Sequence, residues 1–387
     1  MTIQEKILDL SIIWNQVSFV FPHFLTCNLN WNEQYAIFIE KTMKTETDQE
    51  HALLMAEFVN ALGDGHTDIS FAKELRDKAG YFPFELEYLK EGYCLNGQPI
   101  LRIDAMDMED ICKKAGEYIY GVNGFLPRLE YILPFLLDGT EHTIETVANS
   151  IPFRMLSQKP LPSRKSETEF ILHGNILQIK FSDMLCNRQQ EIFEKLKEYQ
   201  PRAVILDVRE NIGGMTKLGA DIAQLFLNGT FGGCRKWTRK MLGVEYASAS
   251  QMMGEGQIQA KKIMDLADFE EYEDQWGAVG QEAVFTGPVV LLTSRKTVSA
   301  AEDFVAFFRS NKRATVIGTS TCGTSGTPLL KKLSCGTLRV CSVGYCLKDG
   351  THWIGKGIQP DIWVEQTAWG RQNGVDEVLE KALEYLA

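Results

Sequence analysis

The sequence predicts an α/β protein that begins with a helical region, and three observations carry this prediction. Residues 5–62 show the apolar spacing of amphipathic helices. Residues 80–156 mix short strand and helix patterns, and from residue 175 onward apolar runs of strand length alternate with amphipathic helices. A chain of 387 residues with this layout is expected to hold two or three domains.

The N-terminal region, residues 1–79, is expected to be helical. Apolar residues recur with helical spacing over 5–21, over about 31–43 and over 48–62. Residues typical of helix ends flank these patterns: Pro22, Asn30 with Glu33, and Thr47 with Glu50. The third helix leads into a glycine-rich turn that holds His66, which taken alone is a loop histidine.

Residues 80–157 are expected to form a small α+β module. Asn96-Gly97 lies between two apolar runs and favours the type I′ turn that joins antiparallel strands. Further patterns predict helices at 108–120 and 126–137 and a strand at 143–147. Lys159-Pro160-Leu161-Pro162 then marks residues 158–169 as a linker, because proline-rich segments act as extended spacers.

Residues 170–387 carry the α/β pattern. Strands are expected at 175–181, 203–208, 289–293 and 314–317, with helices at 188–199, 217–227 and from 299. A hairpin is expected over 333–347 and a helix at the C-terminus. Residues 233–282 interrupt this pattern with a Met- and Gly-rich stretch and an acidic, aromatic run. They are either a lid insertion over the sheet or a peripheral excursion without function.

The composition excludes several classes of protein. The chain is 44% hydrophobic with a formal net charge of −11 and has no basic cluster, so nucleic acid is not an expected partner. No apolar run approaches the ~20 residues of a membrane span, and the first residues lack the layout of a secretory signal. Whether the protein forms a homo-oligomer stays open.

The nine cysteines show no C-x-x-C spacing, so neither a metal site nor a disulfide framework is indicated. Reduced, mostly buried thiols are expected instead. The cytoplasm is therefore the expected compartment, unless a secretory signal has been removed from the chain.

A strand, a short polar turn and a helix start follow one another over residues 289–304, with Ser299 at the helix start. The orphan N–H groups and the positive end of that helix would lie beside the serine, which suits a nucleophile whose attack creates an oxyanion. Ser299 with Glu302 also forms a capping box, so capping alone explains the serine as well. Both interpretations stay open from this stretch.

The turn Asn211-Ile212-Gly213-Gly214 follows a buried strand and precedes a helix. Backbone N–H groups in such a turn are suited to holding an anion. A phosphate-binding loop would end in Gly-Lys-Ser/Thr, which is absent here. By itself, the turn is a weak signal.

Four segments in this order resemble the tail-specific protease (C-terminal processing peptidase) family of serine peptidases and its tricorn-core-like branch. They are Leu62–Thr67 (LGDGHT), Leu206–Gly214 (LDVRENIGG), Val298–Glu302 (VSAAE) and Gly357–Ile362 (GIQPDI). The resemblance implies a crotonase-like ββα spiral for residues 170–387. It also implies a reduced PDZ-like module before this domain and a helical region that carries the His66 turn.

The resemblance implies roles for individual residues. Ser299 aligns with the nucleophile of the family, and the N–H of Ala300 with that of Gly213 or Gly214 would form the oxyanion hole. His66 stands where the tricorn-like branch carries its general base. The Ser/Lys branch carries a lysine in a Gly-Lys-Gly turn, and Thr324 occupies that position here, which favours the histidine.

Two positions depart from the tricorn-like pattern, which orients its network with a serine before the histidine and a glutamate before the Pro-Asp motif. Gly65 and Ile354 occupy these places. Asp64 and Asp349 are therefore the candidates for orienting His66.

The expected function is a serine endopeptidase that acts on polypeptide or peptide substrates through a Ser299 acyl-enzyme, with no metal or organic cofactor. The two departures leave an alternative, a catalytically weak or inactive peptide- or ligand-binding protein on the same scaffold. A crotonase-type acyl-CoA enzyme is a third interpretation, and it is weaker because that chemistry does not use a nucleophilic serine paired with a histidine.

Overall fold

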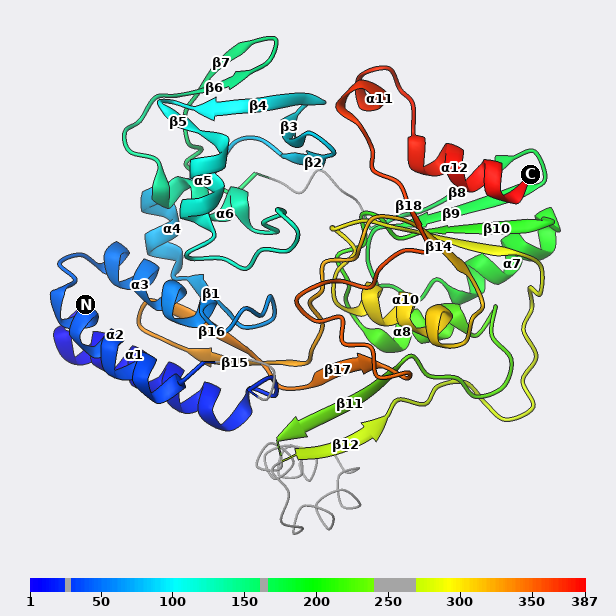
Figure 1. The fold of residues 1–387 in the computed structure, drawn as a ribbon, viewed down its shortest axis with the longest axis horizontal. Coiled ribbons are helices and arrows are strands. Elements are labelled where there is room, and N and C mark those ends of the chain that lie inside the picture. The colour runs from blue at the N-terminus through cyan, green and yellow to red at the C-terminus, as the bar shows by residue number, and fades with distance from the viewer. Residues whose placement is uncertain (25–28, 161–165, 240–268) are drawn as a thin grey trace.

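The computed structural model describes residues 1–24, 29–160, 166–239 and 269–387. Within these ranges the protein has a mixed α/β fold with four sheets. In Figure 1 the N-terminal helices and the module lie on one side, and a six-stranded sheet with its helices lies on the other. None of the helices in the described ranges is both long and apolar enough to cross a membrane.

Three capped helices open the chain, as predicted. They are α1 (Ile3–Val20), α2 (Trp31–Lys44) and α3 (Asp48–Asn60). The Thr47 hydroxyl accepts the N–H of Glu50 at 3.1 Å, and the Glu50 carboxylate accepts the N–H of Thr47 at 3.2 Å, so the predicted capping box is confirmed. After α3 the chain turns at Gly63, whose φ is +65°, toward strand β1 (Asp68–Phe71).

The module follows a short helix, α4 (Lys73–Ala79). Its strands are β2 (Glu87–Leu89), β3 (Gly92–Leu95), β4 (Gln98–Ile103), β5 (Met106–Asp107), β6 (His142–Thr146) and β7 (Ser150–Phe153), and its helices are α5 (Met108–Ala115) and α6 (Leu129–Leu136). The strands pair in the order β2-β3-β4-β6-β7, with β5 beside β4. Asn96 (φ +52°) and Gly97 (φ +71°) form the predicted turn between β3 and β4.

The larger half is built on a sheet in the order β18-β14-β13-β10-β9-β8. Its strands are β8 (Thr168–His173), β9 (Ile176–Phe181), β10 (Ala203–Asp207), β13 (Val289–Thr293), β14 (Thr315–Gly318) and β18 (Ile362–Trp363). Neighbours run parallel, except that β8 is antiparallel to β9. Strand β8 begins inside the range predicted as a linker.

Helices cover both faces of this sheet. They are α7 (Gln189–Tyr199), α8 (Thr216–Ala223), α10 (Ala300–Ser310) and α12 (Glu377–Leu386), with the short α11 (Ala368–Gln372) before the last. Side chains alternate along each strand, so Leu206 packs toward α7, α8 and α10 while its neighbour Ile205 packs toward α12.

The predicted hairpin over 333–347 is wrong in its position. Strands β15 (Pro328–Lys332) and β16 (Gly336–Cys341) form the hairpin, whereas β17 (Gly344–Leu347) pairs with β11 (Cys234–Arg239). The chain passes from one sheet to another between β16 and β17. Apolar residues continue through both strands, so the local pattern does not show where the chain changes sheet.

Strand β16 also pairs with β1, so a strand from the second half completes a sheet of the N-terminal region. Figure 1 shows β15 and β16 beside the N-terminal helices. The hydrophobic core of helices α1–α3 and the module includes residues from 322–341. This interleaving carries the turn between α3 and β1, with His66, to the second half of the chain.

The predicted lid, residues 233–282, is described only at its two ends, because residues 240–268 lie outside the described ranges. Strands β11 and β12 (Phe269–Glu273) pair antiparallel there and join β17 in a three-stranded sheet.

Candidate active site

Ser299 stands between strand β13 and helix α10 with an uncommon backbone conformation. Its φ is +59° and its ψ is −125°, a region that costs a residue with a Cβ about 1–3 kcal/mol. Its N–H donates to the Thr324 carbonyl at 3.0 Å and to Glu302 Oε2 at 3.2 Å. These bonds hold the strained turn in place.

His66 lies in the turn between α3 and β1, and its ring contacts two hydroxyl groups. Its Nε2 is 3.0 Å from Ser299 Oγ, and its Nδ1 is 2.5 Å from Thr324 Oγ1. The residue is only 5% exposed. Arg339 on β16 holds the turn by donating to the Gly65 carbonyl at 3.0 Å. The fold therefore joins in one contact two residues that lie in different halves of the chain.

Burial, together with the nearby Arg339 cation, lowers the pKa of His66 to about 4, so the imidazole is neutral at pH 7. A neutral ring carries one N–H. When the Ser299 hydroxyl donates to Nε2, Nδ1 carries the proton and donates to Thr324 Oγ1. In this tautomer the ring is able to accept the serine proton.

Gly65 leaves the space that Thr324 fills. A Cβ on Gly65 would lie 2.7 Å from Thr324 Oγ1 and 2.8 Å from Tyr120 Cδ1, closer than side chains approach. The hydroxyl at the Nδ1 side of His66 thus comes from residue 324, and it requires a glycine at residue 65.

Glu302 is a fully buried carboxylate that links the start of α10 to the turn that holds Thr324. It accepts hydrogen bonds from the Thr321 hydroxyl (2.5 Å) and from the N–H groups of Gly323 (2.7 Å), Thr324 (2.9 Å) and Ser299 (3.2 Å). Burial raises the pKa of Glu302 to about 8, and these hydrogen bonds oppose the rise. The sequence pattern marked this residue only as a capping partner of the serine.

Backbone N–H groups lie close to Ser299. Neither the N–H of Ala300 nor that of Gly214 has an acceptor within the described part of the chain. The N–H of Gly213 donates to Asn211 Oδ1 at 3.0 Å. A Cβ on Gly213, whose φ is +88°, would lie 2.7 Å from Ser299 Cβ and 3.0 Å from Ala300 N. The Asn-x-Gly-Gly turn therefore lies directly against the serine.

The two carboxylates expected to orient His66 accept hydrogen bonds from residues near them in sequence, and Asp64 also accepts one from the His66 backbone. Asp64 accepts from the Thr67 hydroxyl (2.5 Å), and Asp349 accepts from the Thr351 N–H (2.9 Å). The Nδ1 partner is Thr324. Sequence reasoning missed this role of Thr324, and its only signal was the position, which the resemblance assigns to a lysine in the Ser/Lys branch.

A cavity of about 950 Å³ lies between the module and the carboxyl ends of β9, β10 and β13. Charged side chains of both signs line it, including Lys90, Arg209, Arg295 and Asp376. Its lining residues do not include Ser299 or His66. The cavity lies beside the loop that precedes the serine.

Comparison with known sequences finds a family match in the second half of the chain. Residues 175–364 match peptidase family S41. The carboxyl-terminal-processing protease of Synechocystis is 28% identical over 192 residues, which are 49% of this chain and 38% of that protein. The carboxyl-terminal-processing peptidase 3, chloroplastic, of Arabidopsis thaliana is 22% identical over 228 residues, 58% of this chain and 38% of that protein. The matches thus span less than half the length of these relatives.

Solved structures show the same fold over nearly the whole chain. Mature CPAF has a TM-score of 0.74 at 13% identity, over 98% of this chain and 96% of that chain. The photosystem II D1 C-terminal processing protease has a TM-score of 0.52 at 15% identity, over 93% of this chain and 92% of that chain. At these identities the likeness shows a shared mixed α/β fold.

Proposed function

We propose that this chain, which carries a domain of peptidase family S41 over residues 175–364, is a serine endopeptidase of polypeptide or peptide substrates. The chain is related to the tail-specific serine proteases. The 3.0 Å contact between Ser299 Oγ and His66 Nε2 carries the proposal. A serine that only capped α10 would have no need of a buried, neutral histidine on its hydroxyl. The strained backbone of Ser299 supports the same conclusion, because strain of this kind gathers at functional sites.

The reaction begins when Ser299 Oγ attacks the scissile carbonyl carbon and its proton passes to His66 Nε2. The N–H of Ala300, at the positive end of α10, stabilises the oxyanion together with the N–H of Gly213 or Gly214. His66 then gives the proton to the departing amine, which leaves an acyl group on Ser299. Water, deprotonated by His66, hydrolyses this acyl-enzyme.

Thr324 acts as a positioning residue in this scheme. The Thr324 hydroxyl accepts a hydrogen bond from the Nδ1–H of His66, and this keeps the proton on Nδ1 and leaves Nε2 free to take the serine proton. A neutral hydroxyl stabilises an imidazolium less than a carboxylate does. With a pKa of about 4, His66 is also a weak base. We therefore expect slow turnover.

The weakness of the base favours one alternative, a peptide- or ligand-binding protein of little or no activity on the same scaffold. Reactivity of Ser299 toward an electrophile separates the two functions.

The architecture is part of the proposal. Residues 170–387 form a crotonase-like spiral, and the succession of β8, β9 and α7 as a ββα unit supports this. Residues 80–157 form a reduced PDZ-like module, behind the helical region of residues 1–79 and before a linker at 158–169. A PDZ-like module would bind a peptide as an added strand.

Labelling with a fluorophosphonate tests the function. The reagent should modify Ser299, and Ser299→Ala should abolish both labelling and peptide hydrolysis while the protein melts normally. His66→Ala should slow labelling by about two to four orders of magnitude, because attack then lacks its proton acceptor.

Lys296→Ala is the control, since Lys296 is the lysine nearest in sequence to the serine and should matter little. Full labelling of His66→Ala would refute the role of the base. If several electrophiles left Ser299 unmodified in folded protein, the binding function would replace the peptidase.

A further inference from the structure

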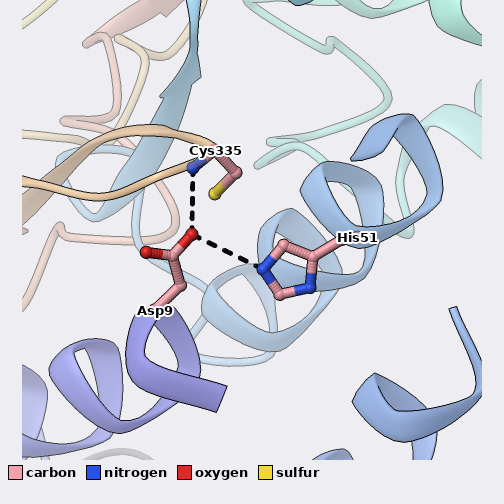
Figure 2. Close-up of side chains that lie close together, drawn as sticks. All are labelled: Asp9, His51 and Cys335. Carbon is pink, nitrogen blue, oxygen red and sulfur yellow. Dashed lines mark hydrogen bonds and ion pairs between the residues drawn. The ribbon is translucent and has the colours of Figure 1, made fainter. Parts of the chain in front are cut away.

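Three potential metal ligands from distant parts of the chain meet in the N-terminal core. Asp9 comes from α1, His51 from α3, and Cys335 from the turn between β15 and β16. All three are buried, at 1% exposure or less. One ligand atom from each lies within 4.8 Å of the other two. Figure 2 shows the Cys335 sulfur and a His51 ring nitrogen both beside the same Asp9 oxygen.

His51 Nδ1 has no hydrogen-bond partner among the described residues, and Nε2 makes only an ion-pair contact with Asp9, although the side chain is fully buried. Its Nε2 is 3.5 Å from Asp9 Oδ2, which is too long for a good hydrogen bond. A buried imidazole without partners is costly, since it gives up its hydrogen bonds to water. Nε2 can bind another atom in the tautomer that carries its proton on Nδ1.

We propose that Asp9, His51 and Cys335 bind a divalent metal ion of borderline softness, with Zn²⁺ as the best match. Zn²⁺ accepts carboxylate oxygen, imidazole nitrogen and thiolate sulfur at about 2.0–2.3 Å, in a tetrahedron. Such bond lengths set neighbouring ligand atoms about 3.3–3.8 Å apart. The 3.5 Å between Nε2 and Oδ2 meets this requirement, and the other two separations lie within 4.8 Å.

Charge balance favours the same ion. Binding releases the Cys335 thiol proton to solvent, so a thiolate and the Asp9 carboxylate offset the two positive charges of the metal. The site is then neutral within an apolar core.

Backbone N–H groups of the hairpin turn already hold the Asp9 carboxylate in place. The N–H groups of Ser334 and Cys335 donate to Asp9 Oδ1 (2.6 Å) and Oδ2 (2.9 Å). Hydrogen bonds of this kind orient metal-binding carboxylates. The cluster lies at the turn of the β15–β16 hairpin, whose strand β16 pairs with β1 just beyond His66. A metal here would fasten α1 and α3 to the strand that supports the active-site turn.

Cobalt titration of the full chain tests the site. The protein is stripped with a chelator under reducing conditions and titrated with Co²⁺, which gives a near-ultraviolet charge-transfer band when it is bound by thiolate. One equivalent should produce the band, and Zn²⁺ should remove it and raise the Tm. Cys335→Ser should abolish the band and weaken Zn²⁺ binding by about 100-fold or more.

Cys94→Ser is the matched control, because Cys94 is equally buried but lies in β3, outside the cluster, and its loss should leave the band unchanged. A band that survives Cys335→Ser, or its absence in the wild-type protein, would overturn the proposal. X-ray absorption of the zinc-loaded wild type decides the matter even if the variant does not fold. One sulfur neighbour supports the site, and a shell without sulfur refutes it.

Discussion

The imidazole of His66 is enclosed by two hydroxyl groups, and a guanidinium lies close enough to disfavour its protonation. A histidine in water titrates near pH 6.5. Burial first, and Arg339 second, lower the pKa of His66 to about 4. His66 is therefore neutral across the physiological pH range, and the fraction of the neutral, proton-accepting form does not change with pH there.

The first prediction follows from the sign of this shift. As pH falls through about 4, protonation of His66 removes the acceptor for the serine proton. The rate of fluorophosphonate labelling should therefore fall near pH 4 and not between pH 6 and 7.5. Arg339→Gln should move this limb to higher pH, because it removes a repelling charge. Circular dichroism monitors the fold at each pH. A wild-type midpoint between 6 and 7 would contradict the buried, neutral state.

The second prediction concerns the hydroxyl on Nδ1. Thr324→Val keeps the shape of the side chain but leaves the Nδ1–H of His66 without its acceptor. Labelling should slow by about 10- to 100-fold, with little change in substrate KM. Thr324→Ser keeps the hydroxyl and should retain most of the rate. Equal losses in both variants would show that the methyl group matters and the hydrogen bond does not.

At the scale of elements, two turns and one helix start meet at the serine. The α3–β1 turn supplies His66, the turn after β14 supplies Thr324, and the start of α10 supplies Ser299. Buried Glu302 joins the last two through hydrogen bonds to their backbones. Because the α3–β1 turn and the turn after β14 are in contact, a larger side chain in one of them displaces residues of the other.

The third prediction tests this contact by placing a serine at residue 65. Gly65→Ser should collide with Thr324 and slow labelling by about 10-fold or more. Thr324→Gly removes both Thr324 atoms that the new Cβ would meet, so the double variant should label faster than Gly65→Ser alone. A double-mutant cycle measures this coupling. Additive losses would mean that the two turns do not share the space.

At the scale of the whole molecule, the two halves of the chain are interleaved. Strand β16 pairs with β1, and residues from 322–341 belong to the core of the N-terminal helices and the module. The second half therefore cannot bury its own hairpin without the first.

The fourth prediction is that residues 166–387, expressed alone, do not form a labelled, cooperatively melting protein. Expressed together with residues 1–160, they should associate and recover labelling, because β1 and the N-terminal core are restored. Gel filtration and calorimetry provide the measurement. Independent folding of the fragment would show that the shared core is dispensable.

Local signals determined much of this protein. Capping residues predicted the starts of α2 and α3, and Asn96-Gly97 predicted the turn between β3 and β4, because caps and tight turns depend on a few neighbouring residues. Apolar spacing predicted β9, β10, β13 and β14 of the central sheet, but not its edge strands β8 and β18. Motifs of a few residues also marked Ser299 and His66 as candidates.

Only the tertiary structure decided how distant residues meet. The 3.0 Å contact of Ser299 with His66 and the place of Thr324 at Nδ1 depend on the pairing of β16 with β1. The lowered pKa of His66 depends on burial by several elements at once. The meeting of Asp9 with Cys335 joins residues 326 positions apart in the chain. Such contacts arise from packing between elements, and neither the period of a helix nor the chemistry of a turn encodes them.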